Sequence, residues 1–178
     1  MTKKSATILG LALSLTACDP GRGPAFREIP VPPEEELAWM NEADSLYGLS
    51  TQESLIRAAA LYSNVVESAQ NRGDPLMEGV ARGSIGVVLK RQGDLADALR
   101  HFRSSARLSR EARHSFNEIQ ALRGIAAVFL EMGSQDSALA YLSQAVQEAR
   151  KIPEDGGLLA EVEARMEEIR ASRGGGGS

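Results

Sequence analysis

The residue types that most often perform catalysis or bind metals are scarce in this chain. It has two histidines, His101 and His114, and a single cysteine, Cys18. Neither histidine is matched by a second histidine or a cysteine at the spacing that a zinc site requires. No serine lies in the Gly-x-Ser-x-Gly setting of a nucleophile elbow. We therefore expect two surface histidines, no metal or cofactor, and a protein that is not an enzyme.

Cys18 follows a short segment with the composition of a secretory signal. Lys3 and Lys4 begin it, an apolar run occupies residues 6–15, and small residues stand directly before the cysteine. A positive start, a short apolar run and small residues are the parts of a signal peptide that is removed after export. The apolar run is much shorter than the roughly 20 residues that a membrane-spanning helix needs.

The run Leu15-Thr16-Ala17-Cys18 resembles the lipobox of bacterial lipoproteins. The resemblance implies that residues 1–17 are removed and that Cys18 carries lipid, such as palmitate, as a membrane anchor. We therefore expect a place in the bacterial cell envelope, facing the periplasm. An ordinary signal peptide with a chance cysteine is the alternative. Asp19 resembles an enterobacterial inner-membrane retention signal, but that rule does not hold in all bacteria, so the choice of membrane stays open.

The composition of the remaining chain indicates one helical domain. Removal of residues 1–17 leaves 161 of the 178 residues and takes the formal charge from −4 to −6, which argues against a nucleic-acid partner. No second cysteine is present for an intramolecular disulfide. Aromatic residues make up only 4% of the chain, so the core is expected to consist of small and aliphatic side chains.

Residues 18–33 hold five of the seven prolines. Proline lacks an amide donor and disfavours helix at the residue before it. We expect an extended tether of about 3 Å per residue between the lipid and the domain. Docking of Phe26, Ile29 and Val31 on the domain is the alternative.

From residue 34 to residue 151, apolar residues recur with the spacing of helices, and no alternating strand pattern interrupts them. The sequence breaks this pattern at five places: Leu49-Ser50-Thr51, Asn71-Arg72-Gly73-Asp74-Pro75, Gln92-Gly93-Asp94, Arg113-His114-Ser115 and Met132-Gly133-Ser134. These breaks predict an all-α domain of short, successive helices.

Two of the breaks belong to a repeat of 40 residues. Gly93 and Gly133 each end an apolar run, as C-terminal glycines of helices do, and Ala98 and Ala138 follow them in register. A further step back by 40 residues reaches Ala58. A helix pair that cannot bury its apolar face alone stacks on its neighbours. We therefore expect three stacked units, at about residues 34–73, 75–114 and 115–152.

The residues within these units indicate how the helices pack. Small side chains permit close approach of neighbouring helices, and larger ones fill the space between pairs. The small set is Gly86, Ala98, Ala126 and Ala138, and the large set is Leu89, Phe102, Phe129 and Leu142.

The segments Gln92-Gly93-Asp94-Leu95-Ala96-Asp97-Ala98-Leu99 and Met132-Gly133-Ser134-Gln135-Asp136-Ser137-Ala138-Leu139 resemble the tetratricopeptide repeat. The resemblance is strong in the second and third units and weak in the first, where the turn lacks its glycine. It implies an all-α, tetratricopeptide-like array of about three helical hairpins, coiled as a short right-handed superhelix. In this family the first helix of each pair lines a concave surface that binds peptide segments.

A last helix is predicted at residues 157–171, within a capping segment at residues 153–172. Its apolar stripe of Leu159, Val162, Met166 and Ile169 would cover the end of the array. Residues 173–178 are expected to be a flexible tail. Their Gly-Gly-Gly-Gly-Ser ending is identical to a widely used artificial linker and is left out of the functional interpretation, with a native flexible terminus as the alternative.

A row of arginines marks one face of a predicted helix. Arg100, Arg103, Arg107 and Arg110 follow each other at helical spacing. The row could bind anionic lipid headgroups or an acidic partner. We favour a solvated outer face, because arginine stems also cover apolar surface.

The predicted concave groove is the stronger candidate for a binding site. The family pattern assigns nine residues to it: Met40, Asp44 and Tyr47 from the first unit, Val87, Lys90 and Arg91 from the second, and Arg123, Ala127 and Leu130 from the third. This set combines an apolar floor with cations, which suits a segment with aliphatic anchors and an acidic group. The asparagines of the chaperone-binding carboxylate clamp are missing. A groove filled by the tether or by the last helix is the alternative.

These features together predict a lipid-anchored, non-enzymatic scaffold that binds a segment of another envelope protein. A periplasmic ligand-binding or delivery protein is the rival interpretation, although a short array cannot enclose a sizeable ligand. A self-associating structural lipoprotein is a third. The sequence leaves the partner, its pathway and the oligomeric state open.

Overall fold

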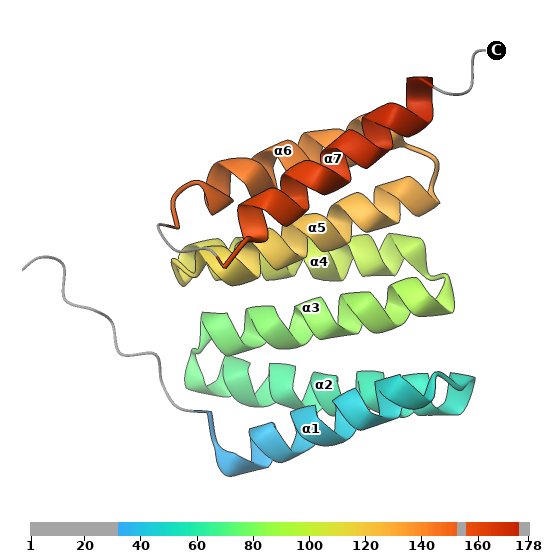
Figure 1. The fold of residues 1–178 in the computed structure, drawn as a ribbon. Helices are drawn as coiled ribbons and strands as arrows, with labels where there is room; N and C mark the ends of the chain where they lie inside the picture. The colour runs from blue at the N-terminus through green and yellow to red at the C-terminus, as the bar shows by residue number, and fades with distance from the viewer. Residues whose placement is uncertain (1–31, 153–155, 175–178) are drawn as a thin grey trace, which may run out of the picture. The chain divides into compact units, whose positions relative to one another are not determined.

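The computed structural model describes residues 32–152 and 156–174. Across these residues it contains seven helices and no strand, and each helix runs back along the one before it (Figure 1). The helices are α1 (Glu34–Leu49), α2 (Gln52–Arg72), α3 (Pro75–Gln92), α4 (Leu95–Glu111), α5 (Ser115–Glu131), α6 (Gln135–Ala149) and α7 (Leu158–Gly174). The all-α, tetratricopeptide-like hairpin array predicted from the sequence is therefore confirmed.

Five predicted elements lie wholly or partly outside the described residues: the signal peptide at residues 1–17, the lipidated Cys18, most of the tether at residues 18–33, the start of the capping segment at residues 153–172, and the end of the tail. The tail prediction is corrected in part, because α7 continues to Gly174 instead of ending at residue 171. In the part of the chain that the structure describes, no helix has the length and apolar content to span a membrane.

Local chemistry explains why the helices begin and end where they do. Gly73 and Gly93 stop α2 and α3 in the left-handed conformation that glycine adopts without strain. The turn after α1 has no glycine, and Ser50 takes the left-handed conformation there at φ 59°. Thr51 and Ser54 then start α2 with a reciprocal capping box, with hydrogen bonds of 3.1 and 3.0 Å.

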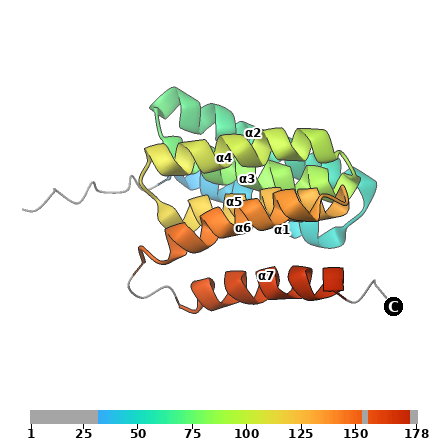
Figure 2. The same cartoon turned by 90° about the horizontal axis from the view of Figure 1, so that it is seen from above.

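The odd-numbered and even-numbered helices are assigned to two layers from the order of the hairpins. Figure 2 shows α2 and α4 on one side of the array and α7 on the opposite side, with α6 overlapping α5 in this view. Each hairpin pairs one helix from each layer, and α3 also contacts α5 within the odd layer. The apolar core lies between the layers in three clusters, centred on the first hairpin, on the α4–α5 boundary and on the last three helices. The odd-numbered helices α1, α3 and α5 therefore present one continuous face, on the side of the array opposite to α4.

Phe102 shows how the middle hairpins fit together. Its side chain projects from α4 and is only 2% exposed. A Cβ atom at Gly86 would lie 3.0 Å from the ring, and one at Gly124 would lie 2.5 Å from it. Both glycines are needed because the ring occupies the space of their missing side chains. The predicted combination of small and large residues is therefore present here, with Gly124 as an additional member.

An ion cluster joins the first helix to the turn between α2 and α3. Glu36 of α1 is fully buried and forms a salt bridge with Arg72 at the end of α2. Arg72 also reaches Asp74 at 3.2 Å, and Asp74 caps α3 by accepting a hydrogen bond from the Met77 amide at 3.0 Å. The two carboxylates raise the pKa of Arg72. This cluster fixes α1 against the array despite the weak repeat signal of the first unit.

His101 is half-buried on α4 and not a surface residue as the sequence predicted. Its Nδ1 atom is buried and has no hydrogen-bond partner among the described residues. Burial lowers the pKa of His101, and the positive charges of Arg82 and Arg100 lower it further, against an opposing effect of Asp97. His114 instead caps α5, because its Nδ1 accepts a hydrogen bond from the Asn117 amide at 3.4 Å.

We expect the domain to lose stability as the pH falls from 7.5 to 5, and His101 to contribute to this loss. Because the pKa of His101 is lower in the folded state, the unfolded state gains its proton first, at about the ordinary value of 6.5. Protonation therefore favours unfolding. Thermal melts of the wild type and of His101→Gln across this pH range test it, with a flatter profile expected for the variant. Parallel profiles would contradict the assignment.

Candidate functional site: the concave face of the odd-numbered helices

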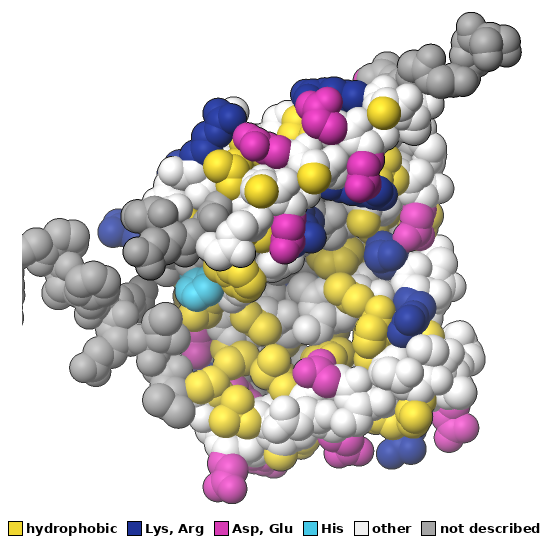
Figure 3. Space-filling model, viewed as in Figure 1, with side chains coloured by type: hydrophobic (Ala, Val, Ile, Leu, Met, Phe, Trp, Pro, Cys, Tyr) yellow, Lys and Arg dark blue, Asp and Glu magenta, His cyan; other side chains and the backbone are white. Residues whose placement is uncertain are grey.

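The nine predicted groove residues all lie on the odd-numbered helices, and none of them is buried. Figure 3 views this face and shows apolar side chains gathered across it, with charged groups along its edges and a hollow in the middle. The structure does not bring the nine residues into one pocket. Four of them line a cavity beside α7, two form a contact between α1 and α3, and Lys90, Met40 and Asp44 lie in neither place.

The cavity has a volume of about 610 Å³ and lies between α5 and α7. Four of the predicted residues line it: Val87, Arg123, Ala127 and Leu130. A smaller cavity of about 220 Å³ adjoins it, and the two share Val87 and Gln120. The floor is apolar and made of short side chains, so it can accept aliphatic groups of a bound segment.

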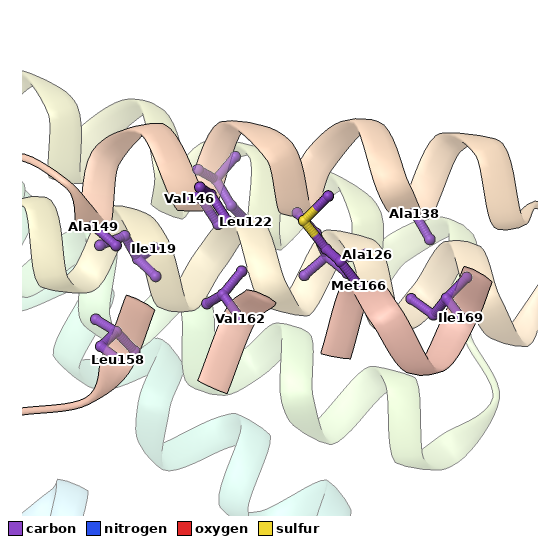
Figure 4. Packing of buried hydrophobic residues seen from close by; sticks show 12 residues of the cluster. Ile119, Leu122, Ala126, Ala138, Val146, Ala149, Leu158, Val162, Met166 and Ile169 are labelled. Atoms are coloured by element: carbon purple, nitrogen blue, oxygen red, sulfur yellow. The ribbon is translucent and has the colours of Figure 1, made fainter. Parts of the chain in front are cut away.

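The helix α7 forms the second wall of the cavity. The sequence analysis kept occupation of the groove by the last helix as an alternative, and α7 lines the groove but leaves a cavity of about 610 Å³ beside α5. Its buried residues Leu158, Val162, Met166 and Ile169 pack on α5 and α6 (Figure 4). The adjacent face of the helix points at the cavity through Glu161, Ala164, Arg165 and Glu168. The amphipathic pattern indicated which face of α7 is buried, but not that a cavity would remain between α7 and α5.

The three predicted cations differ in their surroundings. Lys90 forms a salt bridge with Glu131 at 2.8 Å, and Arg123 forms one with Glu161 at 3.5 Å. Glu131 lies 41 residues after Lys90, close to the length of one repeat. The 40-residue repeat therefore puts the two residues at nearly equivalent positions of neighbouring units, and this salt bridge could have been predicted from it. The two salt bridges join α3 to α5 and α5 to α7.

Arg91 makes the corresponding contact between α3 and α1. Its guanidinium lies 4.3 Å from the centre of the Tyr47 ring. Its Nη1 donates a hydrogen bond of 3.1 Å to the Tyr47 carbonyl oxygen. The last turn of α1 has no basic residue of its own, so Arg91 supplies the positive charge that a helix C-terminus favours.

The remaining two predicted residues belong to the first hairpin. Asp44 accepts a hydrogen bond from the Tyr62 hydroxyl, and burial together with this bond raises the pKa of Tyr62. Met40 packs at the edge of the first core cluster. These two residues lie on the predicted face, but neither lines the cavity beside α7.

The arginine row on α4 is largely paired with acidic groups. Arg100 lies 2.5 Å from Asp97, and Arg107 lies 2.7 Å from Glu111. Arg110 reaches the buried Glu118 with its Nε at 2.8 Å. These pairs favour the solvated outer face over a basic docking stripe. No group of acidic, histidine or cysteine side chains within the described ranges could hold a metal ion.

Comparison with known proteins finds a similarity in the middle of the array. No curated protein matches the chain. The family model of the tetratricopeptide repeat matches residues 77–151, which span α3 to α6 and the two units with the stronger repeat signal. Tetratricopeptide repeats are generally non-enzymatic modules for protein–protein interaction. Residues 77–151 are thus similar to tetratricopeptide repeats, and they lie within a hairpin array that α1, α2 and α7 extend on both sides.

Proposed function

We propose that this protein is a lipid-anchored scaffold of the bacterial cell envelope and binds a segment of a partner protein in its concave face. The cavity of about 610 Å³ between α5 and α7 is the observation that carries the binding part of this proposal. It lies on the face of the first helices of the repeats, has an apolar floor and is open to solvent. A partner would bury aliphatic side chains over Val87, Ala127 and Leu130.

Reversing the three groove charges should remove partner capture. In cells, Lys90→Glu, Arg91→Glu and Arg123→Glu together should reduce the cross-linked and co-purified partner at least tenfold, because like charges would then line the groove edges. The matched control is Arg100→Glu, Arg103→Glu and Arg107→Glu, which makes the same charge change on α4. Thermal melts of both variants report on folding.

A second groove variant is needed because the charge reversal also removes the Lys90–Glu131 and Arg123–Glu161 salt bridges. Ala127 lines the cavity with a single methyl group, so Ala127→Arg should block the cavity without removing a salt bridge. Equal capture by the wild type, the charge reversal and Ala127→Arg would rule out the groove as the binding surface.

The anchor is a separate part of the proposal and rests on the sequence around Cys18. Cys18→Ala should move the protein from the membrane fraction to the soluble fraction and should abolish metabolic labelling with palmitate. Two or more acyl chains give stable membrane binding, whereas none remains in the variant. Labelling that persists in Cys18→Ala would contradict lipidation at this residue, and it would leave the groove proposal intact.

A further inference from the structure

The three cations of the concave face are not equally available to a partner. Lys90 and Arg123 already face the carboxylates of Glu131 and Glu161. Arg91 is exposed, and its guanidinium lies over the Tyr47 ring and donates a hydrogen bond to the Tyr47 carbonyl oxygen. Within the described residues, Arg91 is thus the one cation of the three without a carboxylate partner.

This difference decides where an acidic group would bind. A partner carboxylate at Lys90 or Arg123 must displace an intramolecular carboxylate, so the exchange contributes little binding free energy. At Arg91 no carboxylate is displaced. The ring of Tyr47 also orients the guanidinium, whose planar fork of N–H groups matches a carboxylate in two parallel hydrogen bonds. Only one of these groups is used by the Tyr47 carbonyl.

The position of Arg91 on α3 links this contact to the cavity. Arg91 and Val87 are four residues apart and therefore lie on the same face of the helix, about 6 Å apart along its axis. Val87 lines the cavity beside α7. Residues two apart in an extended peptide are separated by a similar distance, about 6.6 Å. A carboxylate at Arg91 and an aliphatic side chain at Val87 can therefore belong to one short segment.

We propose that Arg91, held over Tyr47, is the carboxylate-binding residue of the groove. The partner segment then carries an acidic residue within two or three positions of an aliphatic residue. The acidic residue binds Arg91, and the aliphatic residue enters the cavity over Val87 and Leu130. This inference rests on the proposed function and narrows it to an acidic, aliphatic peptide.

Selection from a phage-displayed library of random 12-residue peptides tests the inference without a known partner. Panning on the full chain should enrich peptides with Asp or Glu two or three positions from Leu, Ile or Val, several-fold over the unselected library. Panning on Arg91→Gln should retain the aliphatic preference and lose the acidic one. The control Arg103→Gln makes the same charge change on the exposed face of α4 and should retain both preferences.

A titration on the wild-type protein removes any dependence on the folding of a variant. A selected peptide and its Glu→Gln counterpart are compared by fluorescence anisotropy, and the counterpart should bind about tenfold more weakly. Against Arg91→Gln, the two peptides should bind equally. Arg91→Lys keeps the charge but not the planar fork, so it should give an intermediate difference.

The outcomes separate this inference from the proposed function. Enriched peptides without an acidic preference would overturn the role of Arg91, and peptide binding in the groove would stand. An acidic preference that persists in Arg91→Gln would also overturn the role of Arg91 and leave peptide binding in the groove intact. Failure to enrich any peptide on the wild type would overturn both.

Discussion

Replacement of Phe102 with alanine should lower the free energy of unfolding by about 3–5 kcal/mol. The ring is 2% exposed and fills the space between α3 and α5, where Gly86 and Gly124 leave room for it. Its removal leaves a cavity that the rigid helices on either side cannot close. Urea denaturation followed by circular dichroism measures the change.

Phe116→Ala is the matched control, because this phenylalanine lies on α5 and is 50% exposed. It should cost less than about 1 kcal/mol, since about half of the residue is already in contact with water. Gly124→Ala tests the same contact from the other side and should destabilise by about 1–3 kcal/mol, because its methyl group would overlap the Phe102 ring. Equal losses for Phe102→Ala and Phe116→Ala would contradict this packing.

Val162→Asp should detach α7 and lower stability by several kcal/mol. Val162 is fully buried where α7 packs on α5 and α6 (Figure 4). A carboxylate at this position would have no partner, and an unpaired charge in an apolar site is very costly. Release of the helix avoids that cost but exposes Ile119, Leu122 and Met166 to water. Hydrogen exchange should therefore show lost protection in residues 158–174, and light scattering should show association.

Ala160→Asp places the same side chain on the exposed face of α7. The effect should stay within about 0.5 kcal/mol, since surface substitutions are usually this small and an acidic residue suits the first turn of a helix. Full protection of residues 158–174 in Val162→Asp would show that α7 does not cap the array.

The helices could be predicted because their boundaries depend on local chemistry. Gly93 and Gly133 end their helices by adopting the left-handed conformation, and Pro75 starts α3 next to the Asp74 cap. Each of these effects acts within one turn of the chain. The 40-residue repeat then fixed how successive hairpins stack, because equivalent faces must meet in every unit.

The candidate site was less predictable because it depends on distances between helices that are far apart in the sequence. The family pattern placed Arg123 and Leu130 on the face of the odd-numbered helices, and both line the cavity. It could not show that α7 would leave a cavity beside α5, because the apolar stripe of α7 defines a buried face but not a spacing. The pairing of Arg123 with Glu161 depends on that same placement.

The predicted surface position of His101 was wrong for a related reason. A single histidine beside Phe102 gave no sign of which way its ring would point. The fold half-buries the ring and leaves its Nδ1 without a hydrogen-bond partner among the described residues. Such burial follows from tertiary packing and has no signature in the local sequence.

Photo-cross-linking from within the cavity tests the central claim most directly. Gln120 is exposed and lines both cavities, so benzoylphenylalanine at this position would contact a segment bound in the groove. Irradiation of cells should join one dominant envelope protein to position 120, and not to position 103 on α4. The cross-link should disappear in the groove charge reversal. Cross-links of equal yield at positions 120 and 103, or none at position 120, would contradict a partner-binding groove.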